Sequence, residues 1–355
     1  MAWKVLGARF ALRAIGLALL LLQVSCTKLA YVQQAAAGQY DLGVRARDID
    51  DLVREERVDS RTRRLLSEVA RIKRFGERNG LAATENYRKY VRVDRAYVVW
   101  VTSASAPLRF RSKSWAFPVV GSFTYLGWFA QKDAQGFAAE IRQKGWDVDV
   151  RGAAAYSTTG YFEDAVLSTM IPDGDAALGD LTNTILHEMT HATFFMRHQS
   201  TLNESVANFV GNHLAEQYLE ETLGPGAKET AAYLAVERHV QRRGQAMREA
   251  YGALEALYAS AKSDQEKLAE KKELLTRLRT ATAFKRPINN ATLIQYKTYN
   301  SGQEELASLL AACDGSFPRF LRVLKTLETQ TWSKEQEKEV GRMILPLIRS
   351  KPSRG

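Results

Sequence analysis

Five consecutive residues, His187-Glu188-Met189-Thr190-His191, have the types and spacing of a metal site that activates water. Residues four apart on a helix lie on one face, so the two imidazoles can bind one ion. Glu188 lies about 100° further round the helix and directs its carboxylate at the water on that ion. Glu204 follows thirteen positions after His191 and offers a third ligand. The pattern indicates zinc-assisted hydrolysis of a peptide bond.

The sequence around the motif favours a helix from about Asp180 to Met196. This stretch contains no Gly or Pro, and Asp180 stands where an N-cap is expected. The apolar residues that recur at helical spacing are Leu181, Ile185, Met189 and Phe195. We therefore expect both histidines on one helix face.

Glu204 has two interpretations. Thr201-Leu202-Asn203-Glu204 fits a capping box, in which the carboxylate only satisfies backbone amides of the next helix. Alternatively, the first helix runs about five residues past His191, turns near 197–200, and the second helix returns with Glu204 about one turn in. Antiparallel helix axes about 8–10 Å apart would then bring the carboxylate level with the imidazoles. This geometry favours a third ligand, which leaves the fourth position of zinc open to water.

The other polar residues near the motif are weaker candidates. Asn208 lies one turn after Glu204, where it could hydrogen-bond and orient a ligand imidazole, or could simply be a surface residue. His213 lies about 180° around the helix from Glu204 and should face away. His198 falls in the predicted turn and His239 in a basic helix, so we expect both in solvent.

At these residues the chain resembles the gluzincin metallopeptidases, in which a second helix carries an Asn-Glu-x-x-Ala segment, here Asn203 to Ala207. It is similar in particular to the predicted aminopeptidases of bacterial lipoprotein type, through residues 156–169, 203–211 and 289–291. This likeness covers most of the mature chain. It implies one Zn²⁺ and a zinc-bound water that Glu188 activates.

The resemblance also implies candidates that bind the substrate. Gluzincin aminopeptidases bind the substrate ammonium through a Gly-x-Met-Glu-Asn segment, and residues 160–164, Gly-Tyr-Phe-Glu-Asp, are similar in place and pattern. Glu163 or Asp164 would bind the amine, although both also suit a strand-to-loop turn. A tyrosine or histidine stabilises the oxyanion in gluzincins, so Tyr299 and Tyr296 are candidates, although aromatic residues in helices are more often core.

Residues 1–26 have the order of a bacterial secretory signal, with basic residues, an apolar run from Ala14 to Leu22 and a small residue before Cys26. The end of this segment resembles a lipobox, which implies cleavage and a lipid anchor on Cys26. Thr27 in place of aspartate implies the outer membrane, with the catalytic domain facing the periplasm. The alternative is an ordinary cleaved signal with an incidental cysteine.

The charge and the cysteine content narrow the possible partners and the ways in which the fold can be stabilised. The formal net charge is +10, and the signal carries three basic residues and no acid, so the mature chain has 10 − 3, or +7. Its basic clusters are interleaved with glutamate and lack a stacking aromatic array, so we expect no nucleic-acid partner. With Cys26 lipidated, Cys313 is left without a disulfide partner, and the fold must rest on its core.

We expect the mature chain, 27–355, to form a single zincin-like domain of the α+β class that is predominantly helical. Residues 27–95 indicate helices, including one region from Ile49 to Tyr90 with a stop at Asn79-Gly80. Residues 96–170 change to β-branched and aromatic runs around one helix at 133–144, which indicates a small sheet before the metal helices.

The rest of the chain indicates helices. The metal-binding pair occupies 178–223 and stops at Gly224-Pro225-Gly226. We expect residues 224–355 to be helical, with Ala246 to Arg279 forming either one long amphipathic helix or a helix pair divided by the Ser263-to-Glu266 capping box.

The leading hypothesis is removal of N-terminal residues from peptides at the cell envelope, with Glu188 as general base. Two alternatives stay open: a zinc endopeptidase, and a lipid-anchored envelope assembly or binding protein whose zinc site is structural or degenerate. The intact Glu188 argues against the latter, because a structural zinc site has no need of it.

Overall fold

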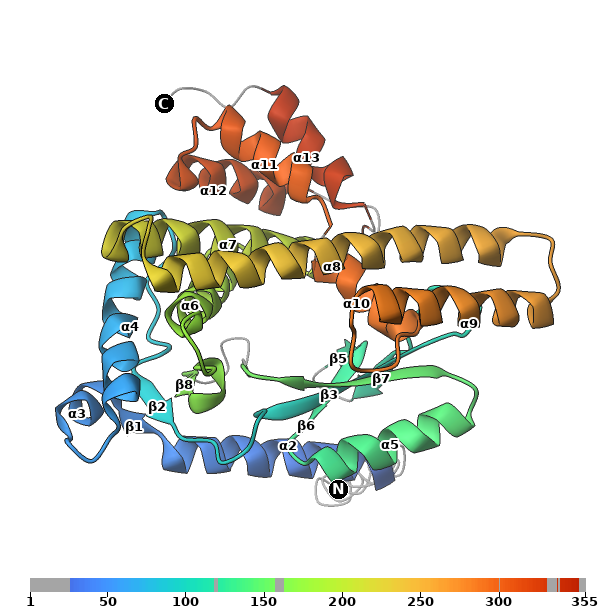
Figure 1. Cartoon of the computed structure of the whole chain (residues 1–355), viewed down its shortest axis with the longest axis horizontal. Helices are drawn as coiled ribbons and strands as arrows, with labels where there is room; N and C mark the ends of the chain where they lie inside the picture. Colours follow the sequence, from blue (N-terminus) through green and yellow to red (C-terminus); the bar gives the residue numbers. More distant parts are fainter. Residues whose placement is uncertain are drawn as a thin grey trace, which may run out of the picture.

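Helices and short strands build the computed structural model (Figure 1), which describes residues 26–117, 121–156, 163–299, 301–330, 337 and 339–350. Helices predominate and the sheets are small, so the predicted α+β class is confirmed. Within these ranges no helix is long and apolar enough to cross a membrane. The predicted signal up to residue 25 lies outside the described residues.

The amino-terminal part consists of three helices and a three-stranded sheet. Its elements are α2 (Cys26–Arg45), α3 (Ile49–Arg54), α4 (Ser60–Arg78), β1 (Arg47–Asp48), β2 (Lys89–Val91) and β8 (Val166–Leu167). β1 pairs antiparallel and β8 parallel with the central strand β2. The prediction of helix as far as Tyr90 is wrong beyond Asn79, because Gly80 takes a φ of +88° and the chain then extends into β2.

The main sheet has strand order β6-β3-β7 and is antiparallel throughout. The elements of this region are β3 (Val99–Ser105), the hairpin strands β4 (Trp115–Phe117) and β5 (Gly121–Phe123), β6 (Tyr125–Trp128), α5 (Gln131–Gln143) and β7 (Asp147–Ala153). Alternate side chains of the sheet pack on α5, with Leu126, Trp128 and Val148 against Phe137 and Ile141. The opposite face of the sheet therefore does not pack on α5.

Two long helical hairpins follow the sheet. Their helices are α6 (Ala177–Thr193), α7 (Ser200–Leu223), α8 (Lys228–Ala259) and α9 (Asp264–Ala281), and the one-turn helix η1 (Ser168–Met170) precedes them. Gly224 ends α7 with a φ of +89°, as its sequence predicts. Ser263 caps α9 in a capping box with Glu266, so the helix pair, and not the single long helix, is the alternative that forms.

The helix that carries His187 and His191 is displaced by about one turn from its predicted bounds. It begins at Ala177, so Asp180 lies in the first turn and is not the N-cap. It ends at Thr193 and not near Met196, because Phe194 is extended. The Thr193 hydroxyl accepts a hydrogen bond of 2.8 Å from the backbone N–H of Ala82, which fixes this end of the helix.

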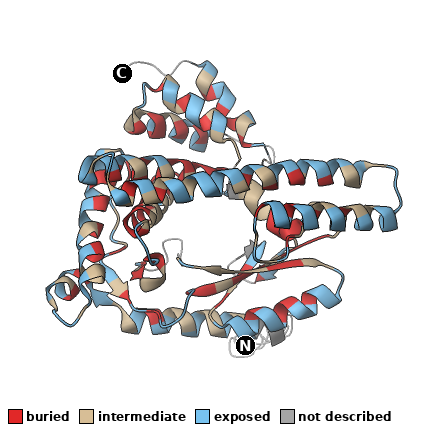
Figure 2. Ribbon diagram, viewed as in Figure 1, coloured by how far each residue is buried: buried red, intermediate tan, exposed pale blue. Residues whose placement is uncertain are grey.

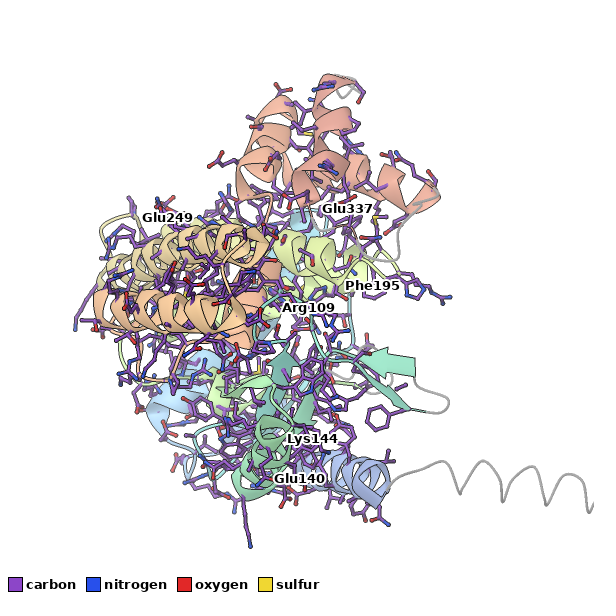
Figure 3. The ribbon with its side chains drawn as sticks, turned by 90° about the vertical axis from the view of Figure 1, so that its right-hand side faces the viewer. Arg109, Glu140, Lys144, Phe195, Glu249 and Glu337 are labelled. Atoms are coloured by element: carbon purple, nitrogen blue, oxygen red, sulfur yellow. The ribbon has the colours of Figure 1, made fainter. Side chains whose placement is uncertain are left out.

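The carboxy-terminal helices lie on the opposite side of α7 and α8 from the main sheet (Figure 1). α10 (Asn290–Tyr299) instead contacts α8 and the strands β3 and β7 of the main sheet. The helices on the far side are α11 (Gln303–Ala312), α12 (Phe317–Lys325), the short η2 (Thr326–Thr329) and α13 (Val340–Arg349). The Phe195 N–H donates to Glu328, and the Glu337 N–H donates to Gln199, so this part contacts the α6–α7 loop (Figure 3). One apolar cluster connects α3, α4, α6, α7, α11, α12 and α13 (Figure 2).

Candidate metal centre

Three side chains from the α6–α7 hairpin converge. His187 and His191 lie one turn apart on α6, and Glu204 lies in the second turn of α7. α7 begins after Gln199 without a side-chain cap, so the capping-box alternative for Thr201 to Glu204 is wrong. The Glu204 carboxylate instead faces the two imidazoles.

The separations between the donor atoms match a tetrahedral zinc site. The Nε2 atoms of His187 and His191 are 3.1 Å apart. Glu204 Oε2 lies 3.5 Å from His187 Nε2, and its Oε1 lies 3.7 Å from His191 Nε2. In a tetrahedron with bonds of about 2.0–2.1 Å, ligand atoms lie roughly 3.3 Å apart. Two imidazole nitrogens and a carboxylate are also the donor types that zinc binds, so these residues fit the ion.

Close packing of α7 against α6 positions this site. A Cβ atom at Gly211 would lie 2.8 Å from Asn183 Oδ1 and 3.3 Å from His187 Cβ, so the helices approach this closely only because position 211 has no side chain. The buried Asn203 amide fixes the loop between them, since it accepts from the Met196 N–H and donates to the Met196 carbonyl, both at 2.9 Å. Asn203 is therefore structural.

Two of the three groups, His191 and Glu204, favour the protonation states in which they bind a cation. Burial and the neighbouring His187 lower the pKa of His191 to about 4. Burial would raise the pKa of Glu204, but the hydrogen bond with His187 and the nearby positive charges lower it overall. Burial lowers the pKa of His187, yet Glu204 and Glu188 outweigh it and leave it raised. Around neutral pH, Glu204 is ionised and His191 neutral, as metal binding requires.

Asn208 and Glu188 both lie beside these donors. Asn208 forms a side-chain hydrogen bond with His187, and this bond favours the charged imidazole. Glu188 acts through its charge on three groups, because it raises the pKa values of His187, Tyr87 and Tyr125. The roles predicted for both residues stay predictions, although their positions suit them.

The two acids predicted to bind a substrate amine differ in setting. Glu163 is exposed, whereas Asp164 is 7% exposed. The Asp164 carbonyl accepts from the Tyr87 N–H at 2.7 Å. Burial raises the pKa of the Tyr87 phenol, and the negative charges of Glu188 and Asp164 raise it further. Asp164 is thus the better placed of the two. Residues 160–162 of the same pattern lie outside the described residues.

The tyrosines predicted to stabilise an oxyanion also differ. The Tyr296 ring contacts Phe284 edge-on, with 6.2 Å between centroids, and belongs to a separate apolar cluster under α8 and α9. Tyr299 closes α10, whose Thr298 carbonyl accepts a 3.2 Å hydrogen bond from the Ser205 hydroxyl beside Glu204. Its backbone therefore lies near the site, and its side chain is outside what the structure describes. The same holds for the side chain of Cys26, which begins α2.

The remaining motif residues support the fold. His213 contacts the rings of Phe209 and Phe317, and His198 and His239 are exposed as expected. Asn289 donates to the Val148 carbonyl at 3.0 Å, and Asn290 to the Ala106 carbonyl at 2.9 Å. The Asn289-Asn290 pair therefore joins α10 to the main sheet.

Three residues near the site were missed by the sequence analysis. Tyr87 is buried and takes a φ of +66°, a conformation that L-residues rarely adopt, beside Glu188 and Asp164. Tyr125 and Arg151 lie on the main sheet. The Arg151 charge and the Tyr125 phenol both interact electrostatically with Glu204. The alternation Asp147-Val148-Asp149-Val150-Arg151 was the available signal, because it places charged residues on one face of a strand.

A family model whose description is "Putative aminopeptidase" matches residues 30–340. Neither the curated proteins nor the solved structures contain a significant match to this chain. The matched stretch includes all three metal donors, Glu188 and the main sheet.

Proposed function

Because the chain belongs to this aminopeptidase-like family, we propose that it is a zinc-dependent peptidase that removes N-terminal residues from peptides. The convergence of His187, His191 and Glu204 carries the proposal. Family membership alone indicates peptide hydrolysis, and the three donors add a metal of the type that activates water.

The residues of the site have distinct parts in this reaction. A bound zinc ion would polarise the scissile carbonyl and bring the pKa of a water toward about 7. His187, His191 and Glu204 would hold that ion. Glu188 accepts the proton of the attacking water and passes it to the departing amine. Asn208 keeps the His187 ring in orientation through their hydrogen bond.

Preference for the N-terminal residue would come from Asp164. Burial raises the pKa of the Tyr87 phenol, and the charges of Glu188 and Asp164 raise it further, so Asp164 lies within electrostatic range of the same ring as the general base. A carboxylate that pairs with the substrate ammonium forms a charge-assisted hydrogen bond. Tyr299 stays the candidate for the oxyanion, because α10 ends beside Ser205.

Glu188→Gln tests the mechanism. The amide keeps the side-chain shape but cannot accept a proton, so we expect unchanged zinc content and thermal stability with peptidase activity about 10²- to 10⁴-fold lower. Glu220→Gln, an exposed acid on α7, is the matched control and should keep full activity. Turnover of Glu188→Gln at the wild-type rate would contradict the role of Glu188.

The choice of substrates tests the direction of cleavage. Amino-acid anilides and free-amine peptides should be cut about 10- to 100-fold better than N-acetylated forms, and Asp164→Asn should remove that preference. Equal cleavage of blocked and free peptides would make the protein an endopeptidase. A zinc-loaded protein that cuts neither class would favour an envelope binding protein with a structural zinc site.

We further propose that a lipid on Cys26 anchors the protein to the outer membrane, facing the periplasm. The support is the order of charged, apolar and small residues before Cys26. Each buried CH₂ of an acyl chain contributes about 0.8 kcal/mol, so Cys26→Ala should release the chain from the membrane fraction. A variant that stays membrane-bound would point to the apolar segment 14–22 as the anchor.

A further inference from the structure

The face of β7 opposite α5 carries three charged residues in alternation, Asp147, Asp149 and Arg151. Both acids are neutralised. Lys271 Nζ lies 2.5 Å from Asp147 Oδ2, and Arg286 pairs with the buried Asp149. The charges of these acids are therefore used within the fold.

Arg151 is different from these neighbours. Its side chain is partly buried, yet within the described part of the chain its guanidinium forms no hydrogen bond or ion pair. A partly buried cation without an anionic partner loses hydration without compensation. Such an arrangement favours an anion that comes from outside the fold.

The strand register places Arg151 near Tyr125. Arg151 pairs with Val101 of β3, and the neighbouring residue on the same sheet face, Ser103, pairs with Tyr125 of β6. Both residues act electrostatically on the metal centre, since Arg151 lowers the pKa of Glu204 and Tyr125 interacts with Glu204 and Glu188. The sheet face with Arg151 and the metal donors thus border one space.

That space is open to water. The Tyr125 side chain is 53% exposed, while surrounding protein still desolvates its phenol and raises its pKa. The Tyr125 ring therefore meets both protein and solvent within electrostatic range of Glu204 and Glu188, where a peptide can approach from water.

The chemistry of the guanidinium indicates what the substrate carries there. Its planar array of N–H donors matches a carboxylate in a bidentate pair. Resting on the proposed function, we propose that Arg151 binds a carboxylate of the peptide substrate beside the metal centre. The carboxylate is either the free C-terminus of a short peptide or an acidic side chain next to the scissile bond.

Three peptides distinguish these sources: Ala-Ala with a free C-terminus, its C-terminal amide, and the amide of Ala-Glu. We expect the zinc-loaded wild-type protein to show a KM about 10- to 100-fold lower for a peptide that carries the recognised carboxylate than for Ala-Ala amide. If only free Ala-Ala gains, the C-terminus is the ligand. If Ala-Glu amide gains as well, a side-chain carboxylate also binds.

Arg151→Gln should raise the KM values of the acid peptides to that of Ala-Ala amide, whereas Arg151→Lys should keep part of the preference. Lys144→Gln is the matched control, because this exposed lysine lies on the α5 side of the sheet, away from α7 (Figure 3). It removes the same charge from the molecule and should keep the full preference.

Two results would overturn the inference. One is equal KM values for acid and amide peptides in the wild type. The other is an equal loss of kcat on all three peptides in Arg151→Gln, since this would assign Arg151 to the reacting carbonyl.

Binding to the metal-free protein separates this inference from the proposed function, because neither turnover nor a zinc–carboxylate bond contributes there. Calorimetric titration should retain the acid preference in the wild type and lose it in Arg151→Gln. If the zinc-loaded protein cuts no peptide but this binding preference persists, the proposed function fails and the carboxylate site stands. If peptides are cut but the metal-free protein binds acid and amide alike, the carboxylate site fails and the proposed function stands.

Discussion

Partly buried carboxylates lie at two places along the α6–α7 hairpin. Their pKa values shift in opposite directions at the two places. At the metal centre, imidazoles and Arg151 outweigh the effect of burial and lower the pKa of Glu204. Near the start of α6, burial raises the pKa of Asp180 to about 6, and burial together with Asp180 raises that of Glu237 on α8 to about 7. Burial is common to both places, so the sign of the neighbouring charge decides which carboxylate can bind a cation.

The polar residues around these two places differ as well. Beside Asp180 and Glu237, the Asn183 amide donates to the Tyr233 hydroxyl at 2.8 Å and to Asn212 Oδ1 at 2.6 Å, so the donors are used within the fold. At the metal centre, the imidazole nitrogens of His187 and His191 and the Glu204 carboxylate lie close together. These groups carry too few protons for every contact among them to be a hydrogen bond. The first arrangement supports packing of α6, α7 and α8, and the second is suited to an ion.

The largest effect should come from removing the carboxylate at the metal centre. Glu204→Ala leaves two ligands of three, so we expect zinc affinity to fall by more than about 100-fold, beyond the effect of losing a residue that only orients a ligand. Competition with a chromogenic chelator measures the affinity. Glu220→Ala on the same helix is the control. If Glu204→Ala binds zinc as tightly as wild type, the Glu204 carboxylate is not a ligand, and the two places do not differ in their ability to bind a cation.

A smaller effect should follow from Asn208→Ala. Loss of its hydrogen bond to His187 frees the ring to rotate, and changes of this kind cost about 10- to 100-fold in metal affinity. Asn212→Ala, one turn further along α7, removes an amide bonded to Asn183 and should leave zinc affinity unchanged. Equal effects of the two substitutions would show that Asn208 acts through general packing.

The smallest effect concerns stability and its dependence on pH. A carboxyl whose pKa is higher in the folded than in the unfolded protein makes the folded state lose relative stability as pH rises between those two values. For Glu237 this window runs from about 4.5 to about 7. Glu237→Gln removes the ionisation, so the metal-free variant should match wild type near pH 4.5 and be more stable by about 1–2 kcal/mol at pH 8.

Urea unfolding at both pH values checks this prediction, with Glu249→Gln as the control because Glu249 is exposed on the same helix. A stability difference that is the same at both pH values would mean that Glu237 does not ionise within this window. The proposed opposition between the two places would then rest on the metal centre alone.

The sequence predicts the convergence of the three candidate metal ligands because their geometry is local. A spacing of four places His187 and His191 on one helix face, and a short turn returns Glu204 to them. The helix bounds were less predictable, because Ala176 caps α6 without a side-chain bond and Phe194 ends it through an extended backbone. Neither alanine nor phenylalanine is a residue type that marks the end of a helix.

The sheet side of the site could not be predicted in this way. Alternation shows which residues of β7 share a face, but it does not show which face meets the metal helices. That assignment depends on α5 covering Leu126 and Val148, a contact between distant parts of the chain. Arg151 therefore appears as an ordinary charged residue in the sequence.

The loop between α6 and α7, which Asn203 fixes, affects the order in which parts of the molecule unfold on heating. The metal donors belong to one hairpin, whereas Tyr125 and Arg151 are brought beside it from strands earlier in the chain. Contacts between nearby residues re-form at a smaller cost in chain entropy than contacts between distant ones. We therefore expect the sheet to separate from the hairpin before the hairpin itself unfolds. A warmed protein would become less selective among peptides before it stopped cutting them.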